Sequence, residues 1–299
     1  MGRGGEQAPH FKGDPQPNSL KPSLQPSRPL IVASRTDQAS FNIAQQIIQQ
    51  TGITKQTLAG QQDFYAGKNN DVQLLILGKE VIYAEPTDLP EISGPIIFVS
   101  KHRSNTDTPA LTVHATGNVT SEALYGGRPE EVSFVEPFRL QSALTILTSE
   151  VKRLGLSIEV TMEATHHGPT SLATPVCFVE VGSGPSQWGD PVLGGVAARA
   201  ALAAAHGAPS TGRSAVGFGG THYPGRLTKL NIEGAYQIGH VVSKYGFDRN
   251  VSDHVLHDTF AKTVGGCETA LVDWKGLKGE QRRRLLDKLS TWNIEPIRL

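Results

Sequence analysis

Cysteine is scarce in this sequence, with only Cys177 and Cys267 among 299 residues. Two cysteines cannot form the disulfide framework of a small secreted domain or a structural zinc site built from several thiolates. Cys177 lies in the apolar run 176–179, which is typical of a small buried hydrophobic residue rather than a nucleophile. This usage favours a reducing compartment.

Net charge and long apolar segments are also lacking. Lys and Arg together number 28, as do Asp and Glu, so the formal net charge is zero. Any contact with nucleic acid would therefore have to use local basic patches. No stretch approaches the roughly 18 consecutive apolar residues that a membrane span needs. We expect a soluble, cytoplasmic protein with no membrane partner.

The first 28 residues lack the apolar periodicity of a folded segment and contain five prolines among Gly, Gln and Ser. Such a segment cannot offset an ordering entropy of about 1–2 kcal/mol per residue. We therefore expect a disordered tail over 1–28 and a single catalytic domain over 29–299. Organellar targeting by the tail is the alternative, although Glu6, Asp14 and the absence of an amphipathic helix argue against a transit peptide.

From residue 29 onward, strand-like apolar runs alternate with segments of helical periodicity. We expect strands at 30–33, 72–77, 81–83, 96–99, 156–162, 176–181, 214–218 and 269–272, and helices at 40–50, 138–154, 192–206, 232–245, 252–263 and 280–289. The alternation has no fixed period, which disfavours solenoids and propellers. It predicts an α/β fold, in which one open, twisted, mostly parallel sheet is flanked by helices.

Histidine is comparatively abundant, and five of the ten histidines lie in polar or glycine-rich segments next to apolar runs. These are His102, His114, His166, His167 and His222. If the strands before them are parallel neighbours, their loops leave the same edge of the sheet, which is where such sheets bind ligands. We therefore expect the imidazoles to converge in one pocket. The alternative for each histidine alone is a hydrogen-bonded structural residue.

The segment 163–170 reads Glu-Ala-Thr-His-His-Gly-Pro-Thr. In extended geometry His166 and His167 would point to opposite faces, so that one meets a ligand and the other braces it. A turn at 168–169 would instead bring both inward. Neutral imidazoles with a carboxylate suit Zn²⁺, whose bound water can ionise near pH ~7 and supply hydroxide for ester cleavage. A polar pocket without metal is the alternative.

Other polar residues accompany the histidines. Thr112 shares the polar face of a strand with His114. Glu180 lies in an apolar strand, where an unpaired charge would cost several kcal/mol, so it needs a histidine or metal partner. Gly219 and Gly220 would let backbone amides approach an anion or a carbonyl closely. Basic residues are Lys101 and Arg103 near the first histidine, and Lys275, Lys278, Arg282, Arg283, Arg284 and Lys288 near the C-terminus.

Six segments, in their order along the chain, resemble the D-aminoacyl-tRNA deacylases of the archaeal and plant type. They are residues 100–104, 110–118, 125–127, 163–170, 178–182 and 219–223. The resemblance implies a fold similar to peptidyl-tRNA hydrolase and the nucleoside phosphorylases. It also implies hydrolysis of the ester that joins a D-amino acid to the 3′-terminal adenosine of tRNA. Plant members are further linked to clearing aldehyde-modified D-aminoacyl-tRNA, and the family is described as binding two zinc ions per chain.

The resemblance assigns roles to the residues above. The expected catalytic residues are His102, Glu163, His166, His167 and His222. The expected metal ligands are a subset of His102, His114, His166, His222 and Glu180. The expected substrate contacts are Lys101, Arg103, Thr112, Asn118, Gly219, Gly220 and Thr221, with backbone amides near the two glycines stabilising an oxyanion and the C-terminal arginines holding tRNA phosphates. Two rival functions are a metal-dependent hydrolase of small amides or peptides and a tRNA-binding protein without catalysis.

Overall fold

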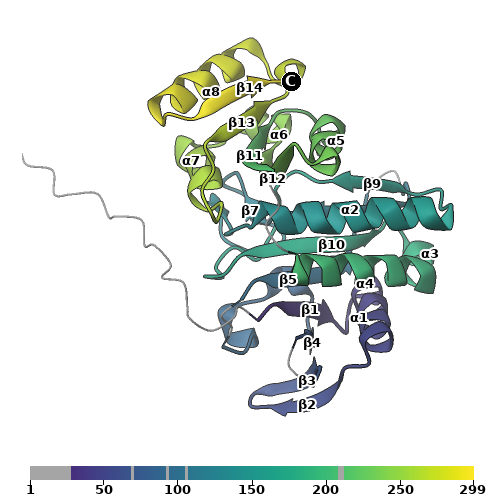
Figure 1. The fold of residues 1–299 in the computed structure, drawn as a ribbon. Coiled ribbons are helices and arrows are strands. Elements are labelled where there is room, and N and C mark those ends of the chain that lie inside the picture. The colour runs from purple at the N-terminus through teal and green to yellow at the C-terminus, as the bar shows by residue number, and fades with distance from the viewer. Residues whose placement is uncertain (1–27, 69–70, 92–93, 105–106, 208–211) are drawn as a thin grey trace, which may run out of the picture.

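The computed structural model describes residues 28–68, 71–91, 94–104, 107–207 and 212–299. Apart from Arg28, the tail expected over 1–28 lies outside the described residues. Among the described residues, no helix has the length and apolar character needed to cross a membrane. Figure 1 shows a larger sheet with helices packed on it and a smaller sheet that carries the C-terminal helices.

The larger sheet has eight strands in the order β2-β3-β4-β1-β5-β10-β6-β9. Their bounds are β1 (Leu30–Ser34), β2 (Thr54–Leu58), β3 (Gln61–Ala66), β4 (Gln73–Leu77), β5 (Ile96–Lys101), β6 (Ala110–His114), β9 (Glu159–Met162) and β10 (Val176–Gly182). Strands β4, β1, β5 and β10 are parallel neighbours. Strands β6 and β9 are parallel to each other, but β6 pairs antiparallel with β10. At the far edge β2 and β3 form an antiparallel hairpin.

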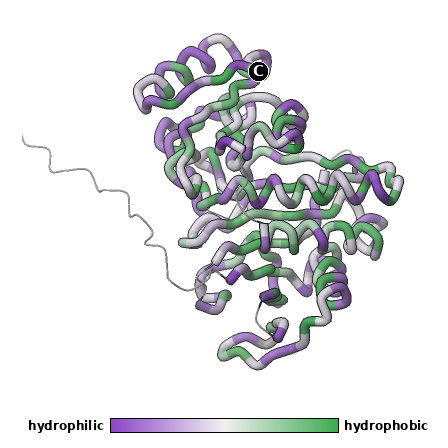
Figure 2. Tube along the Cα trace, in the orientation of Figure 1, coloured by the Kyte–Doolittle hydropathy of each residue, from purple (hydrophilic) through white to green (hydrophobic). Residues whose placement is uncertain are grey.

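Three long helices cover one face of this sheet: α1 (Gln38–Thr51), α2 (Pro137–Leu154) and α4 (Pro191–His206). Local chemistry sets their ends. The Asp37 side chain accepts a hydrogen bond from the Ser40 amide at 3.1 Å and begins α1, whereas Gly52 ends it in the left-handed region at φ 66°. Helix α4 is Ala-rich and packs against both other helices, and Figure 2 shows it hydrophobic along most of its length.

The smaller sheet has four parallel strands in the order β12-β11-β13-β14. They are β11 (Arg213–Phe218), β12 (Tyr236–Val242), β13 (Thr269–Val272) and β14 (Glu295–Arg298), accompanied by α5 (Gly225–Glu233), α6 (Lys244–Asp248), α7 (Asp253–Ala261) and α8 (Gly279–Thr291). Short elements complete the described chain: β7 (Gly117–Asn118), β8 (Glu131–Val132), α3 (Pro185–Trp188), η1 (Val81–Tyr83), η2 (Pro86–Asp88) and η3 (Trp274–Gly276). The carboxyl ends of β11, β12 and β13 share one edge because these strands are parallel.

The prediction of an open, mostly parallel α/β fold is confirmed, with the strands divided between two sheets. Two expected elements are wrong. Residues 81–83 form the 3₁₀ turn η1 rather than a strand, with Val81 buried and Tyr83 exposed. The helix expected over 232–245 is instead the end of α5, strand β12 and the start of α6, because Gly234 stops the helix in the left-handed region at φ 83°. Strands β2, β3 and β14 were not predicted.

Phe98 and Phe178 belong to a smaller hydrophobic cluster of the larger sheet, and both are fully buried and stacked with ring centroids 5.0 Å apart. We expect Phe98→Ala to lower the free energy of unfolding by about 3–5 kcal/mol, because it removes this contact and leaves a cavity. Leu154→Ala, at the exposed end of α2, is the control and should change stability by less than about 0.5 kcal/mol. Urea denaturation measures both. A loss below about 1 kcal/mol in Phe98→Ala would contradict the packing described.

Candidate active site

The site forms where the two sheets meet, at the segment 163–167 that follows β9. On one side, the Glu163 amide donates to the Val113 carbonyl of β6 at 3.0 Å. On the other side, the Ala164 and Thr165 amides donate to the carbonyls of His222 and Val241, each at 2.8 Å. One short segment is therefore hydrogen-bonded to both sheets. This pairing brings the loop after β11 onto the end of β9.

Glu163 lies at the centre of the site and is 1% exposed. Its Oε2 lies 2.7 Å from His222 Nε2 and its Oε1 lies 3.1 Å from His102 Nδ1. The Oε1 contact has poor hydrogen-bond geometry, so this oxygen has no well-formed partner among the described residues. The carboxylate thus connects a histidine that follows β5 of the larger sheet with one that follows β11 of the smaller sheet.

Glu180 is the second buried carboxylate. Its Oε1 accepts from Ser100 Oγ at 2.5 Å, and its Oε2 accepts from Thr112 Oγ1 at 3.3 Å. The same Oε2 lies 3.6 Å from His102 Nδ1 and 3.7 Å from His114 Nε2. The expectation that this carboxylate needs polar partners is therefore met by residues of β5 and β6. Thr112 and His114 both reach it, as expected for neighbours on one strand face.

The two carboxylates determine the charge of His102. Burial opposes protonation of this imidazole, but its contacts with Glu163 and Glu180 prevail and raise its pKa to about 10. Despite burial, the contacts with histidines hold the pKa values of both carboxyl groups below their usual range. His102 Nε2 lies 3.0 Å from the Tyr223 hydroxyl, whose own pKa is raised by burial. His102 is therefore a cation at neutral pH that donates to Glu163 and to the tyrosine oxygen.

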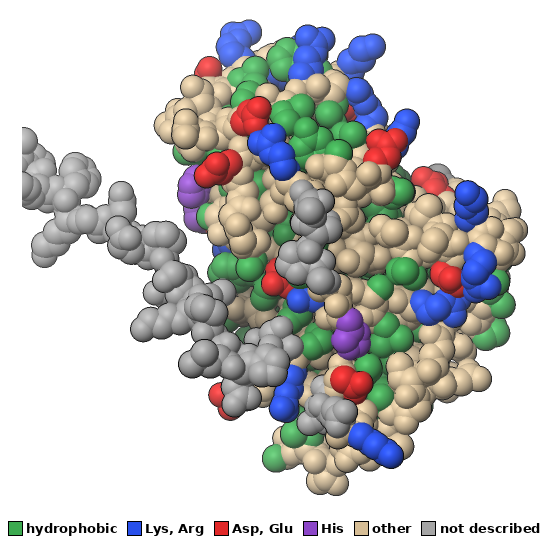
Figure 3. Space-filling view, viewed as in Figure 1, with side chains coloured by type: hydrophobic (Ala, Val, Ile, Leu, Met, Phe, Trp, Pro, Cys, Tyr) green, Lys and Arg blue, Asp and Glu red, His purple; other side chains and the backbone are tan. Residues whose placement is uncertain are grey.

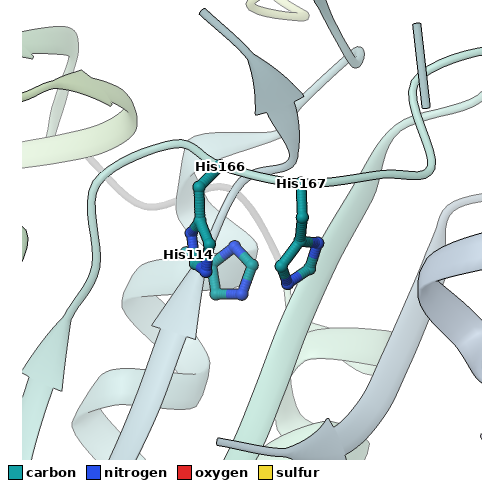
Figure 4. A group of neighbouring side chains, drawn as sticks. All are labelled: His114, His166 and His167. Carbon is teal, nitrogen blue, oxygen red and sulfur yellow. The ribbon is translucent and has the colours of Figure 1, made fainter. Parts of the chain in front are cut away.

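His114, His166 and His167 form a second cluster, which we call the imidazole triad. Their ring centroids lie 4.3 Å (114 to 166), 4.8 Å (114 to 167) and 4.3 Å (166 to 167) apart (Figure 4). Each Nδ1 faces a backbone carbonyl, of Ala115 at 3.2 Å, Ala164 at 2.8 Å and Gly168 at 2.7 Å. These contacts place a proton on Nδ1 and leave each Nε2 lone pair available, the arrangement typical of metal-ligating histidines.

The charge states of His166 and His167 favour this interpretation. Burial and neighbouring imidazoles lower the pKa of His166 well below its usual range and that of His167 to about 4. For His114, burial opposes protonation but Glu180 outweighs it and raises the pKa. The 3.7 Å from His114 Nε2 to Glu180 is nevertheless too long for a hydrogen bond, and this buried nitrogen has no partner among the described residues. A nitrogen that ligates a metal ion has no other partner in the protein, so the unpartnered Nε2 of His114 is consistent with a metal ligand.

The backbone explains why both adjacent histidines face inward. His167 has φ 43°, in the left-handed region that a non-glycine residue seldom adopts. This residue breaks the alternation of extended chain, so the expectation of opposite faces is wrong and the alternative of both pointing inward is correct. The expected common edge of one parallel sheet is also wrong. Strand β9 runs antiparallel to β5 and β10, so the carboxyl ends of β5 and β9 lie at opposite edges of the larger sheet. His222 reaches the segment after β9 because that segment is hydrogen-bonded to the smaller sheet.

Three groups of side chains could hold a metal ion, each with ligand atoms within 4.8 Å of one another. They are His114, His166 and His167; Glu163, His166 and His222; and His102, Glu163 and Glu180. The third group contains the protonated His102, which cannot ligate while it keeps that proton. The triad offers three Nε2 atoms on imidazoles that are braced through Nδ1, and so suits Zn²⁺ with an open position for water. Its donor set fits the zinc that the sequence resemblance implied.

The remaining residues expected to contact substrate have structural partners in the described chain. Lys101 forms an ion pair with Glu80, and Arg103 lies over the Trp188 ring, 5.6 Å from its centroid. Asn118 donates to the carbonyls of Gly126 at 2.8 Å and Arg128 at 3.1 Å. These contacts orient the loops around the site.

Of the glycine pair, Gly219 does not fit the expected oxyanion role. The Gly219 amide donates to the Val242 carbonyl at 2.9 Å, so it is not available to a substrate. Gly219, Gly220 and Thr221 instead line a neighbouring cavity of about 440 Å³ together with Lys244 and Asp273. None of the five site histidines lines this cavity. Tyr223, which the sequence argument did not single out, accepts a hydrogen bond from His102 through its hydroxyl oxygen.

Comparisons with known proteins agree on the family. A model of the D-aminoacyl-tRNA deacylase family matches residues 91–297. The D-aminoacyl-tRNA deacylase of Methanosarcina mazei is 33% identical over 91% of this chain and 92% of its own length. That of Staphylothermus marinus is 35% identical over 85% of this chain and 92% of its own length. That of Aeropyrum pernix is 41% identical over 65% of this chain and 71% of its own length.

The chain belongs to the D-aminoacyl-tRNA deacylase family. A solved crystal structure of a conserved protein of unknown function has the same fold, with a TM-score of 0.83 and 26% identity over 92% of this chain and 96% of that chain. The family resemblance expected from the six sequence segments is therefore confirmed. The match of the family model begins before β5 and extends into β14, so it spans every residue of the imidazole triad and both carboxylates.

One further histidine, outside the five at the site, packs behind the segment 163–167. His240 on β12 is fully buried, with Nδ1 3.1 Å from Thr165 Oγ1 and Nε2 3.0 Å from the Ser133 carbonyl. Burial lowers its pKa from 6.5 to about 4. The unfolded chain therefore binds a proton below pH 6.5 that the folded chain does not. The contribution of neutral His240 to stability is complete above pH 6.5 and is lost as the pH falls towards 4.

We expect His240→Gln to weaken the dependence of stability on pH. The glutamine amide can still donate to Ser133 but cannot ionise, so the fall in unfolding free energy between pH 6.5 and 4 should be smaller by up to about 3 kcal/mol. Urea denaturation at pH 8, 6.5, 5.5 and 4.5 measures this difference. The other histidines are common to both proteins and cancel. Parallel profiles for the two proteins would show that His240 is not neutral in the fold.

Proposed function

We propose that this chain hydrolyses the ester bond of D-aminoacyl-tRNA and releases the free D-amino acid and tRNA. The observation that carries the proposal is the contact of buried Glu163 with both His102 and His222, beside the imidazole triad, in a member of this family. A protonated histidine, His102, lies there beside an ionised carboxylate, Glu163. Such a combination suits acid and base steps at one carbonyl. We further propose that the substrate is met in the cytoplasm, since both cysteines are free.

His222 is suited to act as the general base. Its Nε2 lies 2.7 Å from Glu163, which fixes the proton on this nitrogen and leaves Nδ1 to take a proton from the attacking water. A buried carboxylate that orients a histidine in this way also stabilises the imidazolium that forms. The side chain is 34% exposed, so water and substrate can reach it.

Tyr223 and His102 are suited to stabilise the oxyanion. His102 holds its proton firmly and donates towards the tyrosine oxygen at 3.0 Å, which leaves the phenolic proton of Tyr223 to be donated to the developing negative charge. One such donor is typically worth about 3–4 kcal/mol of transition-state stabilisation. Zinc held by the imidazole triad would add a Lewis acid and lower the pKa of a bound water.

The tRNA body would contact a basic surface near the C-terminus. Figure 3 shows Lys and Arg side chains gathered over the end of the molecule that carries α8 and β14. Part of this charge is used internally, since Lys278 pairs with Asp248, and Arg284 and Lys288 pair with Asp253. Contacts to tRNA phosphates would therefore be weaker than the number of basic residues suggests. Such contacts would position the tRNA but would not distinguish one tRNA sequence from another.

The test of the proposed function compares hydrolysis of D-Tyr-tRNA and L-Tyr-tRNA by the purified chain. We expect hydrolysis of the D form, and we expect His222→Ala to lower kcat roughly 10²–10⁴-fold because it removes the base. His254→Ala, a surface histidine with 72% of its side chain exposed, is the matched control and should leave kcat unchanged. An N-ethyl adduct of D-Tyr-tRNA, made by condensing its amino group with acetaldehyde and reducing the imine with cyanoborohydride, tests aldehyde-modified substrates in the same assay.

Preference for L-Tyr-tRNA, or hydrolysis of small amides alone, would instead favour a general metal-dependent hydrolase. Binding of tRNA without hydrolysis of either ester would favour a binding protein.

For the metal, we expect the double variant His166→Ala/His167→Ala to lose bound zinc, since it removes two of the three braced nitrogens. Elemental analysis of the purified proteins measures zinc content directly, independently of activity. His254→Ala should retain the metal content of the unaltered chain. Full zinc content in the double variant would exclude the triad as the zinc site, and full deacylation after complete removal of zinc by a chelator would exclude the metal from the reaction.

A further inference from the structure

A cavity of about 360 Å³ opens beside the imidazole triad, and we call it the histidine cavity. His166, His167 and His222 line it on the inner side. Its volume lies within the range of about 300–1,000 Å³ that is usual for small-molecule sites. Two other cavities near the loop 219–223 differ from it. One, of about 440 Å³, contacts no site histidine, and the other, beside His102 and Tyr223, measures only about 90 Å³.

Exposed hydrophobic side chains gather at the histidine cavity. Among the described residues six large hydrophobic side chains are exposed, and three of them line this one cavity. They are Leu124 at 73%, Tyr125 at 63% and Tyr245 at 48% exposure. Burial of such groups is normally favourable, so a concentration of them around a cavity indicates a binding surface.

Backbone contacts anchor the two segments that carry these tyrosines. The Tyr125 carbonyl accepts a hydrogen bond from the Gly168 amide at 3.0 Å, which ties its loop to the segment that carries the triad. Gly126 has φ 76°, and a Cβ there would lie 2.0 Å from the Ile82 carbonyl oxygen, so the loop packs tightly against its neighbour. Tyr245 lies on α6, whose first amide, of Lys244, donates to Gly220 at 3.0 Å. One tyrosine therefore belongs to each half of the site.

The chemistry of the substrate decides which part of it occupies this cavity. In the proposed reaction the scissile ester joins the amino acid to the ribose of the terminal adenosine, so that nucleoside lies within a few bonds of His222. The 440 Å³ cavity is excluded because it does not contact the histidines, and the 90 Å³ cavity is too small for a nucleoside. Exposed tyrosines are the side chains on which unstacked bases pack in proteins that bind single-stranded RNA.

We propose that the histidine cavity binds the 3′-terminal adenosine of the tRNA, with the adenine packed against Tyr125 and Tyr245 and the ribose beside His222. This inference rests on the proposed deacylase function and assigns the part of the substrate that this cavity recognises. Stacking is insensitive to the amino acid that is carried, so the cavity supplies binding shared by every D-aminoacyl-tRNA. The small cavity beside His102 is left for part of the aminoacyl group.

The test measures KM and kcat of Tyr125→Ala and Tyr245→Ala on D-Tyr-tRNA and D-Ala-tRNA. We expect each variant to raise KM roughly 10-fold for both substrates with kcat nearly unchanged, because stacking contributes equally to ground-state and transition-state binding. Tyr125→Phe and Tyr245→Phe keep the ring and should restore the original KM. Leu154→Ala, an exposed hydrophobic residue at the end of α2, is the control and should match the unaltered chain.

Adenosine 5′-monophosphate provides a second readout. We expect it to inhibit the unaltered chain competitively and to inhibit both alanine variants more weakly. A rise in KM for D-Tyr-tRNA but not for D-Ala-tRNA would overturn the inference, because the cavity would then hold the amino-acid side chain. An unchanged KM for both substrates would also overturn it. Absence of any hydrolysis by the unaltered chain would instead overturn the proposed function, so the two failures are distinguishable.

Discussion

The structure of the site depends on one buried carboxylate, that of Glu163. Removing a charge from water is costly unless partners replace the lost hydration, and here His102 and His222 supply them at 3.1 and 2.7 Å. These histidines belong to different sheets, so the need to satisfy one charge holds the two halves of the molecule in a fixed relation. Backbone hydrogen bonds from Ala164 and Thr165 to the smaller sheet hold the neighbouring Glu163 where its carboxylate reaches both histidines.

Around this carboxylate, burial separates the histidines into two chemical states. His102 lies between Glu163 and Glu180, and their charges keep it protonated with a pKa of about 10. His167 lies in the triad away from a close carboxylate, where burial lowers its pKa to about 4 and keeps it neutral. The same residue type therefore serves as a fixed cation in one place and as a source of lone pairs a few ångströms away. Acid, base and metal-ligating roles can then coexist in one small site.

Much of the fold followed from local sequence pattern. Helices α1 and α2 and strands β1, β5 and β10 were predictable because their apolar residues recur at helical spacing or form short buried runs bounded by glycine and proline. Strand β12 was not, because a short apolar run is compatible with either a helix or a strand, and only the stop at Gly234 separates it from α5. The family was also recognisable, since each of the six segments that carry the resemblance is a short, uninterrupted run of the sequence.

The sequence by itself determined the candidate residues, because five histidines and Glu163 occur in polar segments next to apolar runs and Glu180 is a charge inside an apolar strand. Only the tertiary structure decided how they meet. The positive φ of His167 turned both adjacent imidazoles inward, and the antiparallel direction of β9 placed its carboxyl end at the opposite edge from that of β5. The pairing of Ala164 with His222 brought the loop after β11 onto the end of β9, and the Gly219 amide, which the sequence suggested for an oxyanion, is bonded to Val242 instead. These outcomes depend on strand direction and on backbone partners distant in the chain, which local residue patterns do not encode.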